Sequence, residues 1–190
     1  TYASGNGCTG GAMLDVISNS GSIITGFRIN GSSNAGTMVP VNVYYLVGSY
    51  LGNETNAGAW TAAGSYSVLS NGLSTPSDYF SLASPIALPA GATIAVYLEY
   101  DADYTNGTTS YTNGNITINT GAGLCGSFSG VNAGRMFNGT VYFGGSACSS
   151  VRTPVSAQQV APITTDLGSD ATICGPSVTL DAGNPTATFN

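Results

Sequence analysis

The chain has 190 residues, of which only 6% are charged, and its formal net charge is −6. An ordinary soluble domain carries roughly 25% charged residues. Three arginines are the only basic side chains, so no basic surface could neutralise a phosphate backbone, and nucleic-acid binding is excluded. The absence of histidine removes imidazole bases and imidazole metal ligands, and with them the usual hydrolase chemistries. We therefore expect a protein that is not an enzyme.

The hydrophobic fraction of 42% predicts a folded core rather than a disordered chain. No apolar run approaches the roughly 18 residues of a membrane-spanning helix, so we expect no membrane span. The first residues do not combine a basic segment with an apolar one, and we expect that any signal peptide has been removed from an exported protein.

Alternating apolar and polar residues predict many short strands. In chain order, the predicted strands are residues 12–18, 22–30, 41–47, 59–69, 78–82, 94–100, 115–119 and 135–143. In residues 41–47 and 94–100, every second residue is more uniformly apolar than the residues between, which predicts one buried face for each strand. Sustained helical periodicity is absent. The predicted fold class is all-β, an antiparallel β-sandwich of jelly-roll or Ig-like type with an extended C-terminal β tail.

Turn signals separate these strands. Six Asn-Gly steps predict tight turns, because both residues tolerate positive φ; they begin at Asn6, Asn30, Asn71, Asn106, Asn113 and Asn138. The sequence Tyr-Thr-Asn-Gly occurs at residues 104–107 and again at 111–114. Its repeated turn chemistry predicts a long hairpin loop.

The composition changes near residue 149, which predicts three parts. Residues 1–148 form the β-sandwich domain, and residues 149–163, with Pro154 and Pro162, form a linker. Residues 164–190 are too few to bury a core of their own. They are therefore either the start of a second Ig-like domain or a strand donated to another molecule.

The densest acidic group suggests two kinds of chemistry. Asp101, Asp103 and Asn106 could supply oxygen ligands to Ca²⁺, although their spacing differs from an EF-hand loop and a solvated loop is the alternative. No other metal or cofactor is expected. Together with Glu99, the same carboxylates could be imagined as a glycosidase pair, but the sequence offers no obvious facing pair.

Aromatic residues suggest carbohydrate binding, since exposed rings can stack on sugar rings. The candidates are Tyr44, Tyr50, Trp60, Tyr66, Tyr97, Tyr104 and Tyr111. The competing interpretation is that these rings pack within strands while the hydroxyl groups stay in water.

Five Asn-x-Ser/Thr sequons are candidate glycosylation sites in an exported protein. They begin at Asn30, Asn53, Asn106, Asn115 and Asn138.

Four well-separated cysteines indicate two structural disulfides in an oxidising compartment. They are Cys8, Cys125, Cys148 and Cys174. We favour pairing Cys8 with Cys125, which leaves Cys148 and Cys174 to clamp the tail. The alternative pairs Cys125 with Cys148 and leaves Cys174 for a partner.

Several segments carry a family resemblance. Residues 166–174 (Asp-Leu-Gly-Ser-Asp-Ala-Thr-Ile-Cys) and 177–185 (Ser-Val-Thr-Leu-Asp-Ala-Gly-Asn-Pro) resemble the opening of Ig-like repeats in large secreted surface proteins of Bacteroidota. Residues 148–155 are similar to the way such repeats end. Residues 48–61 and 135–142 resemble an N-terminal β-sandwich module of the same class, which is exported by the type IX secretion system and includes gliding-associated adhesins. The resemblance implies an extracellular location, tandem β-domains and no catalysis.

The apolar residues of the C-terminal tail predict how copies of the protein would assemble. Ile173, Val178 and Leu180 form an apolar set that a monomer would have to cover, and giving the strand to a neighbour's sheet would cover it. We therefore expect a structural or adhesive cell-surface protein whose partners are copies of itself in a filament or sheath. The alternative is a carbohydrate-binding module of a larger secreted protein, with surface glycans as partners.

Overall fold

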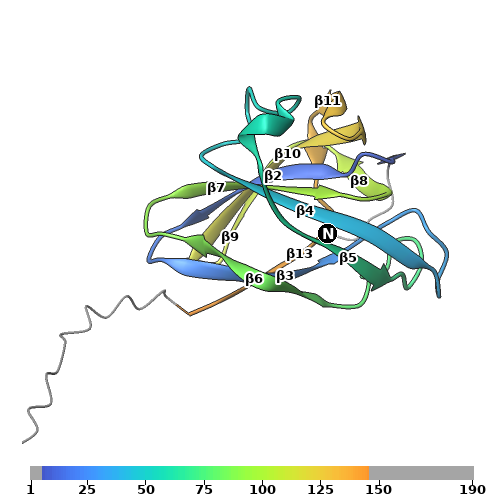
Figure 1. Ribbon diagram of the computed structural model, residues 1–190, viewed down its shortest axis with the longest axis horizontal. Helices are drawn as coiled ribbons and strands as arrows, with labels where there is room; N and C mark the ends of the chain where they lie inside the picture. Colours follow the sequence, from blue (N-terminus) through green and yellow to red (C-terminus); the bar gives the residue numbers. More distant parts are fainter. Residues whose placement is uncertain (1–5, 146–190) are drawn as a thin grey trace, which may run out of the picture. The chain divides into compact units, whose positions relative to one another are not determined.

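The computed structural model describes residues 6–145, which form antiparallel sheets packed against one another (Figure 1). The strands are β1 (Asn6–Cys8), β2 (Ala12–Ser18), β3 (Ser22–Ile29), β4 (Met38–Val47), β5 (Thr61–Leu69), β6 (Phe80–Leu88), β7 (Thr93–Glu99), β8 (Ala102–Asn106), β9 (Thr109–Thr112), β10 (Ile116–Gly126), β11 (Ser129–Ala133), β12 (Arg135–Met136) and β13 (Gly139–Gly144). The single helical element in this part of the chain is a short 3-10 turn, Ala57–Ala59. The predicted all-β sandwich is confirmed. The predicted linker, residues 149–163, and the predicted tail, residues 164–190, lie outside the described residues.

Three sheets enclose one apolar core. The largest has seven strands in the order β11-β10-β2-β7-β4-β5, with β9 also paired to β10. β13, β3 and β6 form a three-stranded sheet, which lies below the large sheet in Figure 1. β1, β8 and β12 form the third sheet. Buried side chains from all three meet in the core, including Leu14 of β2, Phe27 of β3, Leu88 of β6 and Tyr104 of β8.

A second apolar cluster covers the other face of the large sheet. Met13 of β2 and Tyr97 of β7 point away from the main core, and Trp60 and Phe128 pack over them. The ring centroid of Tyr97 lies 6.0 Å from that of Trp60 and 4.9 Å from that of Phe128. Both faces of β7 are therefore buried, and the prediction of a single buried face for residues 94–100 is wrong. Residues distant in the sequence cover the second face.

A buried carboxylate fixes the loop that covers this second face. Asp15 of β2 is only 8% exposed. It accepts hydrogen bonds from the Ser49 hydroxyl at 2.6 Å and from the Tyr50 backbone N–H at 3.0 Å. The Trp60 indole N–H donates to the carbonyl of Asn53 at 2.9 Å, which closes the loop on itself. Since the carboxylate is paired in this way, burying it is tolerated.

The strand predictions fail where the chain changes sheets. The predicted single hairpin loop over the Tyr-Thr-Asn-Gly repeat is wrong. The first copy ends β8, and the second begins in β9 and ends in the β9–β10 turn, while β8 and β9 belong to different sheets. Gly107 and Gly114, which end the two copies, have φ of 122° and 89°. The predicted strand over residues 135–143 is split into β12 and β13, since the chain crosses between sheets at Phe137 and Asn138, both buried.

Tyr97 should make stability depend on alkaline pH. Its ring is fully buried and its hydroxyl donates to the Gly10 carbonyl at 2.6 Å. Burial raises the pKa of this phenol far above its ordinary value, and the nearby Glu99 carboxylate raises it further. The folded state thus holds the proton that the unfolded chain releases near pH 10, so stability should fall as the pH rises above about 10.

We predict that Tyr97→Phe makes this alkaline loss smaller and lowers the free energy of unfolding at pH 7 by about 1 kcal/mol, because the Gly10 carbonyl loses its donor. Urea unfolding between pH 7 and pH 11 measures both effects. If the free energy of unfolding fell equally steeply with alkaline pH in both proteins, Tyr97 would not be the residue responsible for this pH dependence.

Candidate functional site

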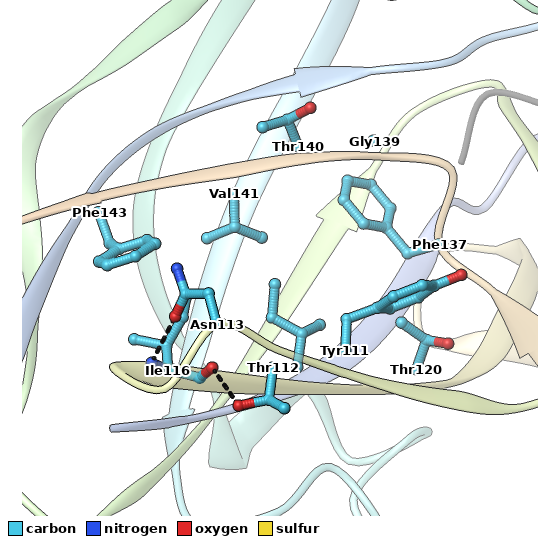
Figure 2. Close-up of a pocket in the computed structure, with 11 residues that line it drawn as sticks. Tyr111, Thr112, Asn113, Ile116, Thr120, Phe137, Gly139, Thr140, Val141 and Phe143 are labelled. Atoms are coloured by element: carbon cyan, nitrogen blue, oxygen red, sulfur yellow. Dashed lines mark hydrogen bonds between the residues drawn. The ribbon is translucent and has the colours of Figure 1, made fainter. Parts of the chain in front are cut away.

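One side of the sandwich is open. Among the described residues β13 pairs with β3 alone, so it is an edge strand of the small sheet. Facing it, β9 pairs with β10 and with no other strand of residues 6–145, so it forms an edge of the large sheet. Between these edges lies a groove of about 290 Å³, whose lining Figure 2 shows. We call it the β9–β13 groove.

The β9–β13 groove exposes part of the inner face of the large sheet. Ile118 of β10 is paired in register with Val16 of β2, a core residue, and with Tyr111 of β9. These three side chains therefore share one face. Val16 is completely buried, whereas Ile118 is partly buried and Tyr111 is 41% exposed. Burial thus decreases along this face toward β9, since the small sheet ends at β13.

The groove lining is apolar and carries no charge. Ile116, Ile118 and Phe137 line it, and Val141 and Phe143 project into it from β13. The polar residues at its end are already paired. The Asn113 side-chain oxygen accepts the Ile116 N–H at 3.1 Å, and the Thr112 hydroxyl donates to the Ile116 carbonyl at 3.2 Å. The arrangement can bind an uncharged apolar segment, and its lining contains no Asp, Glu, His, Cys, Lys or Arg side chain.

The other half of β10 is covered. Tyr104 of β8 lies against Gly123, where an added Cβ would come within 2.5 Å of the tyrosine ring. Glycine is needed there because only a residue without a Cβ admits the ring. The open region is therefore confined to the first half of β10.

The predicted calcium ligands do not converge on an open site. Asp103 is buried, and its carboxylate accepts a hydrogen bond from the Asn30 amide at 3.2 Å. Asn106 is exposed, and its side-chain oxygen accepts a hydrogen bond from the Asn6 amide at 3.4 Å. Within residues 6–145, no group of three or more His, Cys, Asp or Glu side chains could hold a metal ion. Calcium binding at Asp101, Asp103 and Asn106 stays a prediction.

Glu99, the other acidic residue of that group, is also held by neighbours. Its carboxylate accepts hydrogen bonds from the Asn42 amide at 3.0 Å and from the Tyr44 hydroxyl at 3.3 Å. Burial raises the pKa of Tyr44, and the Glu99 charge adds to this effect. These contacts join β4 to β7 and explain the carboxylate without a catalytic role.

Most of the candidate sugar-stacking aromatics are packing residues. Tyr50, Trp60, Tyr97 and Tyr104 are at most 8% exposed, so the packing interpretation holds for these four and they cannot stack on a sugar. Tyr44 and Tyr66 are partly buried, and Tyr111 lies at the groove.

An exposed tyrosine pair was not among the predicted sites. Tyr79 and Tyr142 are 42% and 36% exposed, and their ring centroids are 4.8 Å apart in an edge-to-face arrangement. Tyr79 lies over Gly26 of β3, where a Cβ would come within 2.7 Å of its ring. The sequence signal is weak, because the two tyrosines are distant in the chain.

Two of the five candidate glycosylation sites are incompatible with the fold. Asn30 and Asn138 are completely buried. Asn30 donates to Asp103, and Asn138 accepts a hydrogen bond from the Thr105 hydroxyl at 3.2 Å. A glycan on either amide would have no room, so these two predictions are wrong. Among the remaining sequons, Asn53 is partly exposed, and Asn106 and Asn115 are exposed.

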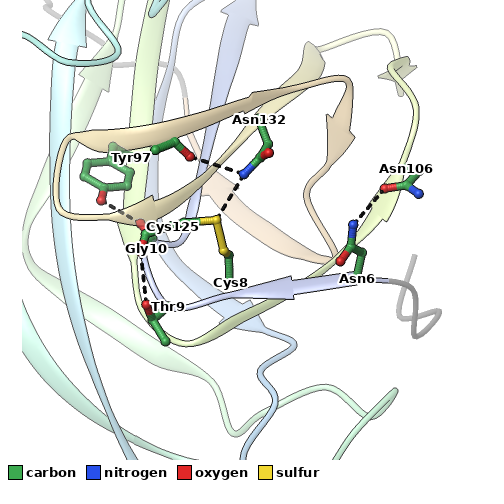
Figure 3. Close-up of a disulfide and its surroundings, with 9 residues drawn as sticks. Asn6, Cys8, Thr9, Gly10, Tyr97, Asn106, Cys125 and Asn132 are labelled. Carbon is green, nitrogen blue, oxygen red and sulfur yellow. Dashed lines mark hydrogen bonds between the residues drawn. A yellow bond between two sulfur atoms is a disulfide. The ribbon is translucent and has the colours of Figure 1, made fainter.

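A disulfide joins the β1-β8-β12 sheet to the large sheet. Cys8 of β1 is bonded to Cys125 of β10, with the Cα atoms 4.7 Å apart (Figure 3). The Asn132 amide donates to the sulfur of Cys125 at 3.1 Å, and the Thr9 hydroxyl donates to the Cys125 carbonyl at 3.2 Å. The preferred pairing of Cys8 with Cys125 is confirmed, and the alternative pairing of Cys125 with Cys148 is wrong. Cys148 and Cys174 lie outside the described residues.

Comparison with known proteins gives no family assignment. No protein-family model matches the sequence, and no curated protein matches it. In the part of the chain that the structure describes, no helix is long and apolar enough to cross a membrane.

Removing the disulfide should destabilise the sandwich strongly. The bridge spans 117 residues, and closing a loop of that size stabilises a fold by about 5 kcal/mol in the chain-entropy account. We expect the double variant Cys8→Ser, Cys125→Ser to lose about that much free energy of unfolding in urea denaturation. A denaturation midpoint equal to that of the unchanged protein would show that the β1-β8-β12 sheet does not need this bridge.

Proposed function

We propose that the protein is a non-catalytic, extracellular structural or adhesive protein of the cell surface, and a subunit of a filament or sheath. The observation that carries this proposal is the open side of the sandwich, where the β13 edge that no strand of residues 6–145 pairs with borders the apolar β9–β13 groove. An exposed sheet edge is a template for pairing with another chain. A strand from a second copy would bond to β13 and cover the groove at the same time.

The mode of assembly follows from the position of the two surfaces. The groove belongs to the sandwich, whereas the apolar set Ile173, Val178 and Leu180 belongs to the tail, outside the described residues. A contact between two different surfaces is head-to-tail, and it generates a filament when it does not close into a ring.

The extracellular location is supported by the chemistry of the chain. The Cys8–Cys125 disulfide is typical of proteins that mature in an oxidising compartment. The low charge content suits a fibre in which many copies pack closely, because few like charges would repel one another. The resemblance of residues 48–61, 135–142, 166–174 and 177–185 to secreted surface proteins of Bacteroidota agrees with this location.

The test is electron microscopy of the full chain beside a variant that ends after Pro162. We expect fibres from the full chain and separate globular particles from the shortened variant, because the latter lacks the donated strand. If both preparations contain only separate particles, the proposed function is wrong.

A second candidate function is carbohydrate binding, which the exposed Tyr79–Tyr142 pair favours. A tyrosine face in water can stack on a sugar ring. On a glycan array, this function predicts binding that Tyr79→Ala reduces at least tenfold and that Tyr111→Ala leaves unchanged. Absence of binding to any glycan would exclude it for the sugars on the array.

A further inference from the structure

We propose that the β9–β13 groove is the acceptor site for one specific strand, residues 177–181 of a second copy, with Val178 and Leu180 filling the groove. This inference rests on the proposed function, and it names the partner, the segment and the side chains that make the contact.

The β13-β3-β6 sheet does not extend far enough to cover the inner face of the large sheet at β9. Ile118 and Tyr111 belong to the inner face of the large sheet, yet both keep exposed surface because no further strand of the described residues lies beside β13. An additional strand beside β13 would lie opposite them. Val141 and Phe143 would then lie next to the side chains of the new strand, as residues do across neighbouring strands.

The groove requires an occupant without charge. Its lining contains no charged residue, and burying an unpaired charge there would be strongly unfavourable. Residues 171–180 also contain no charged side chain, and Asp170 and Asp181 flank them. An aspartate that favours water thus flanks each end of the uncharged stretch. These two residues limit how much of the segment can enter the groove.

The alternation of the segment selects the inserted part. Val178 and Leu180 are two residues apart, so in a strand they point to the same face, while Ser177, Thr179 and Asp181 point to the other. Gly175 and Pro176 separate this stretch from Ile173, and proline is compatible with the first position of a strand. Two apolar side chains thus face the groove, and three polar side chains face solvent.

The connection is long enough to reach another molecule. The last described residue is Gly145, and residues 146–176 separate it from the proposed donor strand. A chain of that length can span up to roughly 100 Å when extended. The donor strand of one copy can therefore reach the groove of the next without distorting either sandwich.

Two complementary full-length variants test the contact. The donor variant carries Val178→Asp with Leu180→Asp, and the acceptor variant carries Ile118→Glu. Thr179→Asp is the matched control for the donor, because it adds a charge to the opposite face of the same strand. Thr117→Glu is the matched control for the acceptor, since Thr117 lies beside Ile118 in β10 and points to the opposite face.

We expect each variant alone to remain monomeric in size-exclusion chromatography with light scattering, and both controls to assemble like the unchanged protein. An equimolar mixture of the donor and acceptor variants should form dimers and nothing larger. In that mixture only one intact strand and one intact groove can meet. Circular dichroism checks that each variant is folded, and Phe143→Glu replaces Ile118→Glu if the latter fails this check.

The other outcomes are distinguishable. If the mixture of folded variants stays monomeric, residues 177–181 of a second copy do not occupy the groove, and the inference is wrong. If the donor variant still forms filaments, the inference is wrong while the proposed function survives through another contact. If the unchanged full chain is monomeric, the proposed function fails and this inference fails with it.

Discussion

The unequal width of the sheets is the constraint on which the rest of the structure depends. The inner face of a seven-stranded sheet must be covered, and two three-stranded sheets do this work. The β1-β8-β12 sheet covers the second half of β10 through Tyr104, and the disulfide from Cys8 to Cys125 holds it there. The β13-β3-β6 sheet covers the centre and stops before β9. The apolar surface that remains is the β9–β13 groove, so the candidate site is a direct consequence of the sheet arrangement.

A chain with few charges must satisfy its buried polar groups in other ways. Neutral amides and phenols replace ion pairs in this sandwich. Asn30 donates to the buried Asp103, Asn138 accepts from Thr105, and the Tyr97 hydroxyl donates to the Gly10 carbonyl. Between neutral groups, as at Asn138 and Tyr97, such hydrogen bonds avoid the high desolvation penalty of a buried ion pair. Because only 6% of the residues are charged, the surface is also poor in charge, a property that suits close packing of copies.

The sequence predicted the fold class and several strands well, because alternation along one strand is a local signal. β2 matches its predicted range, and β4 and β7 contain most of theirs. The errors arise where distant segments meet. The sequence leaves Tyr97 and Trp60 either exposed or packed, and they pack on the outer face of the large sheet under a loop held by Asp15. Asn30 and Asn138 resemble turn residues and sequons, although crossing between sheets buries them. The groove itself could not be predicted, since it depends on how many strands each sheet acquires.

Hydrogen exchange of the β13 backbone, followed by mass spectrometry, tests the central claim most directly. The amides on the free edge of β13 have no strand partner among the described residues, so they should exchange quickly in separated subunits. Filling the groove with a strand would pair these amides and slow their exchange many-fold in the assembled protein. We predict this protection over Gly139–Gly144, with little change in β4, which lies between β7 and β5. Equal exchange of β13 in separated and assembled protein would contradict strand insertion at the open side of the sandwich.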